Sequence, residues 1–550
     1  MAIERMRTWS GILSIFLASI AIGQTAPSTY WVQFTDKSNT PYSLAQPQEF
    51  LSDRSIQRRI TQGIPLDELD LPVDPNYIAQ VLALGDIQLH NTSKWFNAIT
   101  IVSTDTAALQ QITDLPFVAQ MRNTRSVEVG TPRPDKFRSI GNNDRAFDYG
   151  AAFTQVSMMN GHLLHDLSHG EGILIGVLDS GFDRADSIPA FQELRDRNGI
   201  VATRDMVDHD GDVYDDHYHG RSVLSVMAAI WEGQLVGTAP GADYVLIRTE
   251  DADSEFIVEE DNWVAGAEYA DSLGCDVLNT SLGYSRFDDT LQNHTYADMD
   301  GYTTRISIAA GIASSKGMIP VNSAGNSGES DWYYITAPAD AHDILAVGAV
   351  GTMEESAPFS SHGPSADGRV KPDVAAVGWG AAGLNFEGDS VAAINGTSFS
   401  SPLVAGLVAC LWELHPQRTA HEIMDAVRRS ASHYNEPNED VGFGVPDFMI
   451  AHDLLVLSTG MEEHSDQAIK VHPVPFSDRL EIRIDHEGMA DVSISDVMGR
   501  TIWTGVKRIM SGRISLNDPV LQQLSPGTYL LRISSAGKSW NTKVVKADRW

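Results

Sequence analysis

Three short stretches of the sequence each carry a residue type that can take part in acyl transfer. An apolar run ends in Asp179, His219 follows forty residues later in a His-Gly pair, and Ser398 lies in a Gly-Thr-Ser sequence. A serine hydroxyl can attack a carbonyl carbon when a histidine takes its proton and a carboxylate orients the imidazole. Each residue also has an ordinary explanation on its own, because Asp and Ser commonly cap helices. The chain order Asp, His, Ser is one of three known for unrelated triads of this kind.

The elements around these residues predict how they are positioned. Between about residues 145 and 456, short apolar runs alternate with helical patterns. This alternation predicts an α/β fold, a doubly wound parallel sheet covered by helices on both faces. The expected strands are Ile173–Leu178, Asp243–Ile247, Asp276–Leu282, Met318–Asn322 and Ile344–Val350, and the expected helices include Ser222–Trp231, Val258–Leu273 and Arg305–Ser315. Ligands of such sheets bind at the carboxyl ends of the strands, where Asp179 is expected.

The motifs around the three residues resemble those of a known family. Asp179-Ser-Gly, His219-Gly and Gly396-Thr-Ser-Phe-Ser-Ser-Pro402 are similar to the three signature motifs of the subtilisin-like serine peptidases, the subtilases. Other segments resemble the family in the same order, namely Gly237–Ala242, Asn279–Gly283, Asn322–Asn326, Phe359–Pro364 and Lys371–Ala376. The resemblance covers about residues 150 to 455. It implies a serine endopeptidase with Asp179, His219 and Ser398 as its triad and no cofactor required for the chemistry.

The same resemblance implies further site residues. Asn326 corresponds to the side chain that donates to the developing oxyanion, although Asn is also a common turn residue. Ser281, Leu282 and Gly283 resemble the strand that pairs with the substrate backbone and lines the primary specificity pocket. The implied partners are protein or peptide substrates bound in extended form.

Two positions depart from the family pattern, and one residue competes for a role. Arg221 stands where Thr usually follows His-Gly, and Ser401 stands where Ala commonly precedes Pro402. Neither change removes a reacting group, but Arg221 puts the catalytic rate in doubt. His217 is a rival base that lacks the following Gly.

An acidic run and two cysteines raise separate questions. Asp208, Asp210 and Asp212 lie in a carboxylate-rich run around a Gly, which fits either a structural calcium site or a solvated acidic loop. Only Cys275 and Cys410 are present, both in apolar segments, so we expect buried free thiols, with a disulfide bond as the alternative.

The composition limits the partners. The formal charge of −34 opposes binding to nucleic acid and to anionic lipid surfaces, and it indicates a solvated surface. Residues 1–23 place Arg5 and Arg7 before an apolar run of about a dozen residues, which is typical of a cleaved signal peptide. Because no later run has 18 or more apolar residues, we expect no transmembrane helix in the mature protein.

The flanking segments predict two further domains. Residues 24–130 resemble the propeptides of Bacteroidetes subtilases, notably at Phe50–Arg59 and Ser93–Ala98, which implies a small α+β domain that assists folding, inhibits the enzyme and is removed by self-cleavage. The linker around Thr131–Asp135 separates it from a peptidase domain at 145–456. Period-two strands in 465–550 predict a β-sandwich. It resembles the sorting domain of the type IX secretion system, which implies contact with outer-membrane secretion machinery and a secreted, extracellular or surface-attached protein. A plain binding domain is the alternative.

Two other functions compete with the peptidase. A non-catalytic surface protein on a decayed subtilase scaffold would have no reason to retain all four of Asp179, His219, Asn326 and Ser398. An esterase is disfavoured because the chain lacks the Gly-x-Ser-x-Gly elbow.

Overall fold

The computed structural model describes residues 28–125 and 149–459 and, with short gaps, the strands between 470 and 546. It divides into two compact units, Met1–His452 and Asp453–Trp550, which are considered separately. The expected signal segment 1–23 and the expected linker Thr131–Asp135 lie outside the described residues.

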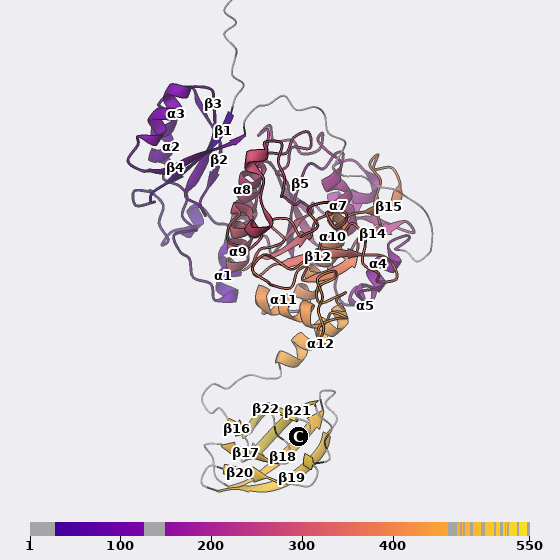
Figure 1. The fold of residues 1–550 in the computed structure, drawn as a ribbon. Coiled ribbons are helices and arrows are strands. Elements are labelled where there is room, and N and C mark those ends of the chain that lie inside the picture. The colour runs from indigo at the N-terminus through magenta and orange to yellow at the C-terminus, as the bar shows by residue number, and fades with distance from the viewer. Residues whose placement is uncertain are drawn as a thin grey trace, which may run out of the picture. The chain divides into compact units, whose positions relative to one another are not determined.

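A seven-stranded sheet forms the centre of the first unit (Figure 1). Its strand order is β13-β12-β11-β10-β5-β9-β6, and every neighbouring pair is parallel. The strands are β5 (Leu174–Asp179), β6 (Ile200–Asp205), β9 (Asp243–Arg248), β10 (Val277–Thr280), β11 (Ile319–Ser323), β12 (Leu345–Val350) and β13 (Val374–Val377). The four from β10 to β13 and β5 are buried along their whole length, as expected for strands covered on both faces. The predicted α/β fold class is confirmed.

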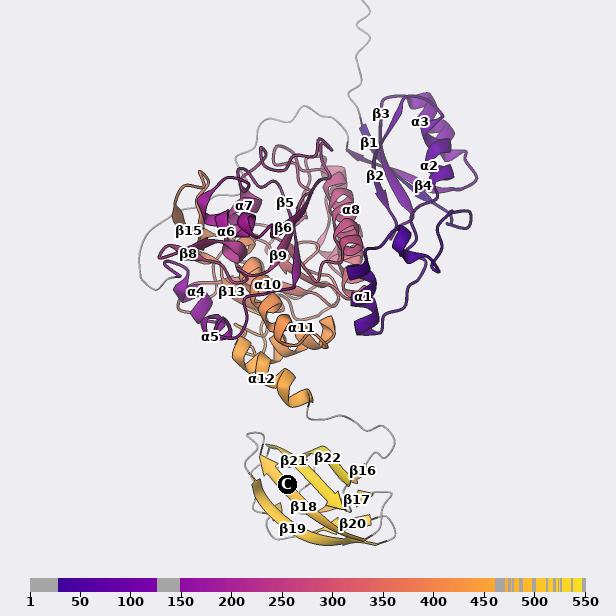
Figure 2. The same cartoon turned by 180° about the vertical axis from the view of Figure 1, so that it is seen from behind.

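Helices cover both faces of this sheet (Figure 2). Helices α8 (Val258–Leu273) and α9 (Arg305–Ser315) pack against each other on one face, and α7 (His219–Ala228) and α10 (Thr397–Leu414) pack against each other on the other. Helix α10 has the length and apolar composition of a membrane span, but 89% of that stretch is buried inside the fold. The remaining helices of this domain are α4 (Phe153–Ser157), α5 (Gly161–Leu164), α6 (Gln192–Asp196), α11 (Ala420–Arg429) and α12 (Phe448–Thr459).

One predicted helix is displaced. The stretch Ser222–Trp231 was expected to be helical throughout, but α7 begins at His219 and ends at Ala228. Ala229 is extended, with φ −64° and ψ 139°, and the chain then forms a hairpin of β7 (Ile230–Trp231) and β8 (Leu235–Val236). Gly233 turns this hairpin with φ +70°, a conformation that glycine adopts without strain. The apolar pattern therefore continued from a helix into a strand.

The N-terminal domain is a four-stranded antiparallel sheet with helices, as the α+β expectation requires. Its strand order is β2-β3-β1-β4, with β1 (Ser28–Phe34), β2 (Ile87–Ser93), β3 (Ala98–Ser103) and β4 (Val118–Arg125). Helices α2 (Pro75–Leu82) and α3 (Thr106–Thr113) pack on it, and α1 (Asp53–Gln62) begins after Ser52, whose hydroxyl accepts from the Ser55 N–H. An apolar core that includes Val32, Ile99 and Ile112 holds the layers together.

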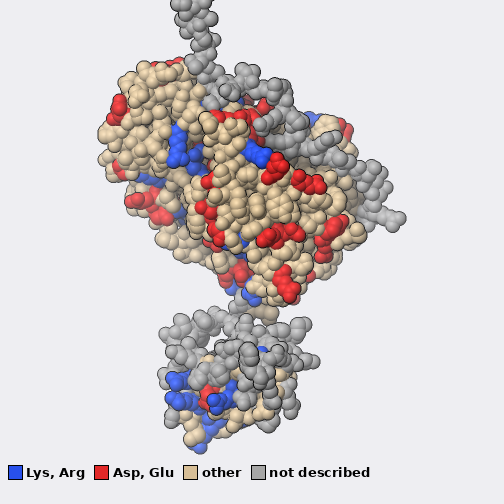
Figure 3. Space-filling model, viewed as in Figure 1, with Lys and Arg blue, Asp and Glu red and all other residues tan. Residues whose placement is uncertain are grey.

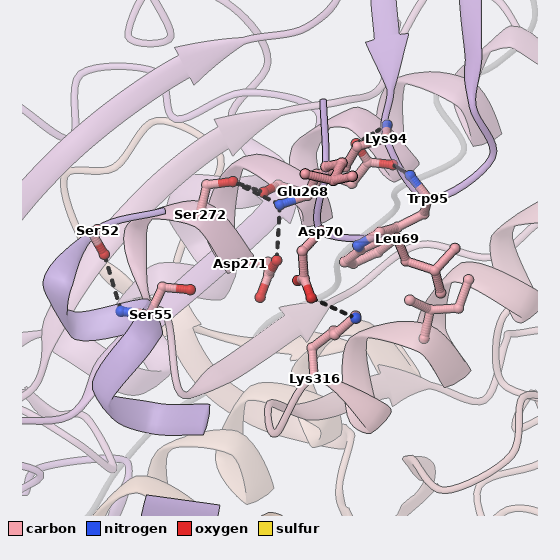
Figure 4. Close-up of polar contacts among 12 residues, drawn as sticks. Ser52, Ser55, Leu69, Asp70, Lys94, Trp95, Glu268, Asp271, Ser272 and Lys316 are labelled. Atoms are coloured by element: carbon pink, nitrogen blue, oxygen red, sulfur yellow. Dashed lines mark hydrogen bonds and ion pairs between the residues drawn. The ribbon is translucent and has the colours of Figure 1, made fainter. Parts of the chain in front are cut away.

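Buried ion pairs join this domain to the sheet domain. The Asp271 carboxylate at the end of α8 is fully buried and contacts Arg58, Arg59 and Lys94 of the N-terminal domain. Figure 4 shows Lys94 between Asp271 and Ser272, at 3.0 and 2.9 Å. Burial alone would raise the pKa of Asp271, but the three cations outweigh it and hold that pKa well below its usual range. Removal of one partner from such a buried ion pair typically lowers the free energy of unfolding by about 3–5 kcal/mol.

The second unit contains two antiparallel sheets over one core. The sheets are β16-β17-β20 and β19-β18-β21-β22, and Ile482, Ile494 and Leu531 are among the buried residues that they share. Its strands are β16 (Lys470–His472), β17 (Leu480–Arg483), β18 (Gly488–Asp496), β19 (Thr501–Ile509), β20 (Arg513–Leu516), β21 (Gly527–Ser535) and β22 (Lys538–Lys546). Two sheets on one core form the expected sandwich.

Many acidic side chains lie on the surface of the first unit. Figure 3 shows Asp and Glu side chains in many small groups over the visible face of that unit.

Cys275 and Cys410 are both buried and free, which confirms the expected thiols. Burial raises the pKa of each thiol, so both stay protonated.

Candidate active site

Asp179 and His219 meet at the carboxyl edge of the central sheet. Asp179 is the last residue of β5 and His219 is the first of α7, as the sequence predicts. Their contact joins His219 Nδ1 and Asp179 Oδ1 at 2.7 Å, and the two residues are 2% and 0% exposed. Asp179 Oδ1 also accepts from the Ser180 N–H at 2.8 Å, which fixes the carboxylate. A buried carboxylate at Nδ1 favours the tautomer that leaves Nε2 able to accept a proton.

Ser398 lies in the first turn of α10, the other predicted helix start. Gly396 precedes this helix with φ +145°, and the backbone bends there before the helix begins. The Ser398 hydroxyl donates to the Ser281 carbonyl at 3.2 Å, and the Ser281 hydroxyl donates to the Ser398 carbonyl at 2.8 Å. The His219 ring lies beside the same turn, 5.8 Å from the ring of Phe399. The nucleophile candidate is thus anchored on the strand that the resemblance assigns to substrate binding.

Asn326 is oriented by the residue before Ser398. Its Oδ1 accepts from the Thr397 N–H at 2.9 Å and from the Thr397 hydroxyl at 3.0 Å. The amide oxygen is thereby committed to Thr397, and the amide Nδ2 donor is left for another acceptor. Gly396 passes close to that donor, since a Cβ on Gly396 would lie 3.6 Å from Asn326 Nδ2.

A cavity of about 250 Å³ brings the predicted residues together. Ser281, Leu282 and Gly283 line it, and so do Asn326 and Ser398. The cavity is therefore continuous between the nucleophile candidate, the oxyanion donor candidate and the predicted substrate strand. Its further wall includes Glu250, Glu255 and Arg286, which the sequence did not single out.

The structure explains both departures from the family pattern. Arg221 is fully buried and forms an ion pair with Asp183, and its other nitrogen donates to the carbonyl oxygens of Asn385 and Phe386. It thus ties the loop after Asp179 to the loop that precedes the Ser398 segment. Ser401 is buried, and its hydroxyl donates to Asn279 Oδ1 at 2.9 Å, so its extra polar group is satisfied.

The rival base His217 has a different partner. Its Nδ1 lies 2.9 Å from the Ser180 hydroxyl, and the Asp179 carboxylate contacts His219 instead. The geometry therefore favours His219 as the base.

The three candidate calcium ligands do not converge. Asp208 pairs with Arg248 at 2.6 Å, Asp210 accepts from the Asp212 N–H, and Asp212 accepts from the Tyr214 N–H. Among the described residues, the group of three carboxylates whose oxygens all lie within 4.8 Å of one another is Glu250, Glu255 and Glu259. Sequence reasoning missed this group, although an acid-rich run between 250 and 261 was the available signal.

Comparison with known proteins shows the family of this chain. Residues 170–444 match the Subtilase family. The chain belongs to that family. Residues 29–138 of this subtilase match the Peptidase S8 propeptide domain of Bacteroidota, and residues 470–547 match a secretion system C-terminal sorting domain. The two segments first singled out as propeptide-like, Phe50–Arg59 and Ser93–Ala98, supply Arg58, Arg59 and Lys94 to the buried ion pairs with Asp271.

Individual relatives cover parts of the chain. The subtilase is 31% identical over 261 residues to the thermophilic serine proteinase of Bacillus sp. (strain AK1), which covers 47% of this chain and 56% of that protein. It is 27% identical over 270 residues to subtilisin BL of Lederbergia lenta, covering 49% of this chain and 87% of that protein. It also resembles the membrane-bound transcription factor site-1 protease of Mus musculus, at 30% identity over 44% of this chain and 21% of that protein.

Solved structures show a weaker likeness. The crystal structure of MycP1 from the ESX-1 type VII secretion system aligns with a TM-score of 0.46 at 20% identity, over 58% of this chain and 90% of that one.

Proposed function

We propose that this protein is a secreted serine endopeptidase that uses Ser398 as nucleophile, His219 as general base, Asp179 as the group that orients it and Asn326 as oxyanion donor. The observation that carries the proposal is the 2.7 Å contact of His219 Nδ1 with Asp179 Oδ1 beside a cavity that Ser398 and Asn326 line.

The proposed reaction has two halves. In the first, Ser398 Oγ turns from the Ser281 carbonyl towards His219, gives its proton to Nε2 and attacks the scissile carbonyl carbon. The developing oxyanion accepts from Asn326 Nδ2 and the Ser398 N–H, and His219 returns the proton to the leaving amine. In the second half, a water molecule gives a proton to His219 and attacks the acyl carbon, and His219 returns that proton to Ser398 Oγ as the bond between Oγ and the acyl carbon breaks. The buried Asp179 carboxylate stabilises the imidazolium in both halves.

In this proposal the protein is made as a precursor and cleaves its own chain. Intact chains of the Ser398→Ala variant are expected to accumulate uncut, while the wild type separates the N-terminal domain from the peptidase domain. Gel electrophoresis with N-terminal sequencing of both proteins, expressed in the same host, measures this. Ser401→Ala is the matched control, because it removes a hydroxyl from the same helix and should process normally. Normal processing of Ser398→Ala would refute self-maturation.

The contact between the two domains is expected to weaken in acid. His90 Nε2 lies 3.0 Å from Asn262 Oδ1 across this contact, and His90 Nδ1 lies 3.2 Å from Nε2 of His209. Burial, followed by the neighbouring His209, lowers the pKa of His90 from 6.5 to about 4. The separated domain therefore binds more protons than the docked one between about pH 6.5 and 4, so docking is strongest above this window and is lost as the pH falls through it.

We predict that the cleaved N-terminal domain binds the peptidase domain about tenfold more weakly at pH 5 than at pH 7.5, since the full shift of His90 is reduced by its partial exposure. Size-exclusion chromatography of the cleaved wild type at the two pH values measures the fraction that stays bound. The His90→Gln variant keeps a neutral side chain and should show a shallower pH dependence. An equal pH dependence in wild type and His90→Gln would contradict the prediction.

The C-terminal unit fits a role in export. Its match to a secretion system sorting domain, together with the expected signal segment 1–23, supports a route to the cell surface or the extracellular space. The type IX machinery is the proposed partner. No cofactor is part of the proposed chemistry, and a structural calcium ion remains an expectation.

A further inference from the structure

The cavity beside Ser398 has an acidic wall. The Ser281–Gly283 segment and Asn326 line the part next to the nucleophile, and Glu250 and Glu255 line another part of the same cavity. Glu250 lies just after β9, which ends at Arg248, and Glu255 lies just before α8. The two carboxylates are therefore held at the ends of two neighbouring elements of the core rather than on a free surface.

The carboxylates are arranged closely. Oxygens of Glu250, Glu255 and Glu259 all lie within 4.8 Å of one another, and Glu250 and Glu259 are only 2% and 1% exposed. Tyr284, the residue after the Ser281–Gly283 segment, donates its hydroxyl to Glu250 Oε2 at 2.8 Å. Ionised carboxylates at this separation repel one another, and a cationic group that enters the cavity reduces this repulsion.

We propose that this cavity selects a substrate with a lysine or arginine side chain among the last residues before the scissile bond, and that Glu255 is the residue that determines this preference. The inference rests on the proposed peptidase function. In that reaction the acyl part of the bound substrate extends from the oxyanion site along Leu282 and Gly283. Its side chains then reach the cavity that Glu255 and Glu250 line. Ammonium and guanidinium groups donate charge-assisted hydrogen bonds to carboxylates, and these are stronger than neutral ones.

A second observation is independent of the cavity. If the chain cuts itself, its own connecting sequence is a substrate, and residues 126–148 contain four basic residues, Arg133, Lys136, Arg138 and Arg145. This segment has equal numbers of acidic and basic residues, whereas the whole chain has 73 acidic against 39 basic ones. The connecting sequence thus offers cationic side chains that the chain as a whole is poor in.

Arg286 lies in the same cavity and carries a charge opposite to that of Glu255. Its side chain is exposed and adds one positive charge to the cavity. Removal of this charge should leave the preference for basic substrates unchanged or increase it, whereas removal of the Glu255 charge should decrease it.

The experiment compares fluorogenic tetrapeptides that carry lysine or norleucine at one of the four positions before the cut. Norleucine matches the lysine stem without the charge. For the wild type we expect kcat/KM to be at least about tenfold higher with lysine at one position, with a ratio that falls as salt increases. In Glu255→Gln this ratio should fall about tenfold while hydrolysis of the norleucine peptide is kept, which shows that the variant is folded. Asp253→Asn, an exposed carboxylate on the same segment that does not line the cavity, should keep the wild-type ratio.

Three outcomes would overturn the inference. The first is equal rates for lysine and norleucine at all four positions in the wild type. The second is an unchanged lysine preference in Glu255→Gln. The third is that Glu255→Gln loses a calcium-dependent rise in melting temperature without any change in substrate preference, which would assign the three carboxylates to a metal ion. Failure of the norleucine peptides as well would instead refute the proposed peptidase function on which the inference rests.

Discussion

The Ser398→Ala variant is expected to hydrolyse a peptide substrate with a kcat lower than that of the wild type by a factor on the order of 10⁶, with little change in KM. Without the hydroxyl no acyl-enzyme forms, and only water held near Asn326 and the Ser398 N–H remains to attack. His219→Ala should have a similar effect, since an unassisted hydroxyl is a weak nucleophile. Asp179→Asn should lower kcat by a factor of about 10⁴, because it stabilises the wrong tautomer of His219. These sizes come from measurements on serine peptidases, including subtilisin.

The controls for this prediction concern folding and additivity. The N-terminal domain has to be removed from each variant with an unrelated site-specific protease, and melting temperatures should then agree with that of the wild type. A double variant of Ser398 and His219 should be no slower than either single one, because the residues act as a unit. Ser401→Ala should stay within a few-fold of the wild type, since the Ser401 hydroxyl bonds to Asn279. A loss of less than about tenfold in Ser398→Ala would contradict the assignment.

Replacing Asn326 with alanine is expected to lower kcat by about 100- to 1000-fold while KM changes little. The reason is that Nδ2 would donate to an oxygen that becomes an anion only in the transition state, so its loss spares substrate binding. This size was itself obtained from the corresponding donor in subtilisin. Steady-state kinetics on one neutral peptide measure both constants.

Thr397 gives this second prediction its control. It donates to Asn326 Oδ1 through both its N–H and its hydroxyl. Thr397→Val removes only the hydroxyl and keeps the N–H contact, so it should lower kcat far less than Asn326→Ala does. Loss of less than about threefold in Asn326→Ala, or an effect confined to KM, would show that Asn326 is a turn residue without a role in the oxyanion site.

Much of the fold was predictable because it depends on local patterns. The stretch Val258–Leu273 has its predicted bounds, and β5 and α7 place Asp179 and His219 where a strand end and a helix start were expected. The hairpin at Ile230–Trp231 was missed, since its pairing with Leu235–Val236 is a contact between strands that no single-strand periodicity reports.

The less predictable part of the site depends on contacts between distant segments. Arg221 could be noticed as unusual, but its carbonyl partners at Asn385 and Phe386 lie more than 160 positions away. The acidic run at Asp208 fitted either a calcium site or a solvated loop, and its ion pair with Arg248 of β9 joins two segments that the sequence does not link. Charge composition could indicate an acidic run near 250–261, but not that its carboxylates line the cavity of Ser398.

The central claim is tested most directly by active-site labelling with a fluorophosphonate probe. Such a probe phosphonylates only a serine whose hydroxyl is activated by a base next to an oxyanion site. The cleaved wild type is predicted to take up one label per chain, located on Ser398 by mass spectrometry of the digested protein, and to degrade casein. Labelling should disappear in His219→Ala even though Ser398 is present. A correctly cleaved wild type that is neither labelled nor able to degrade casein, or that carries its label on another serine, would contradict the account.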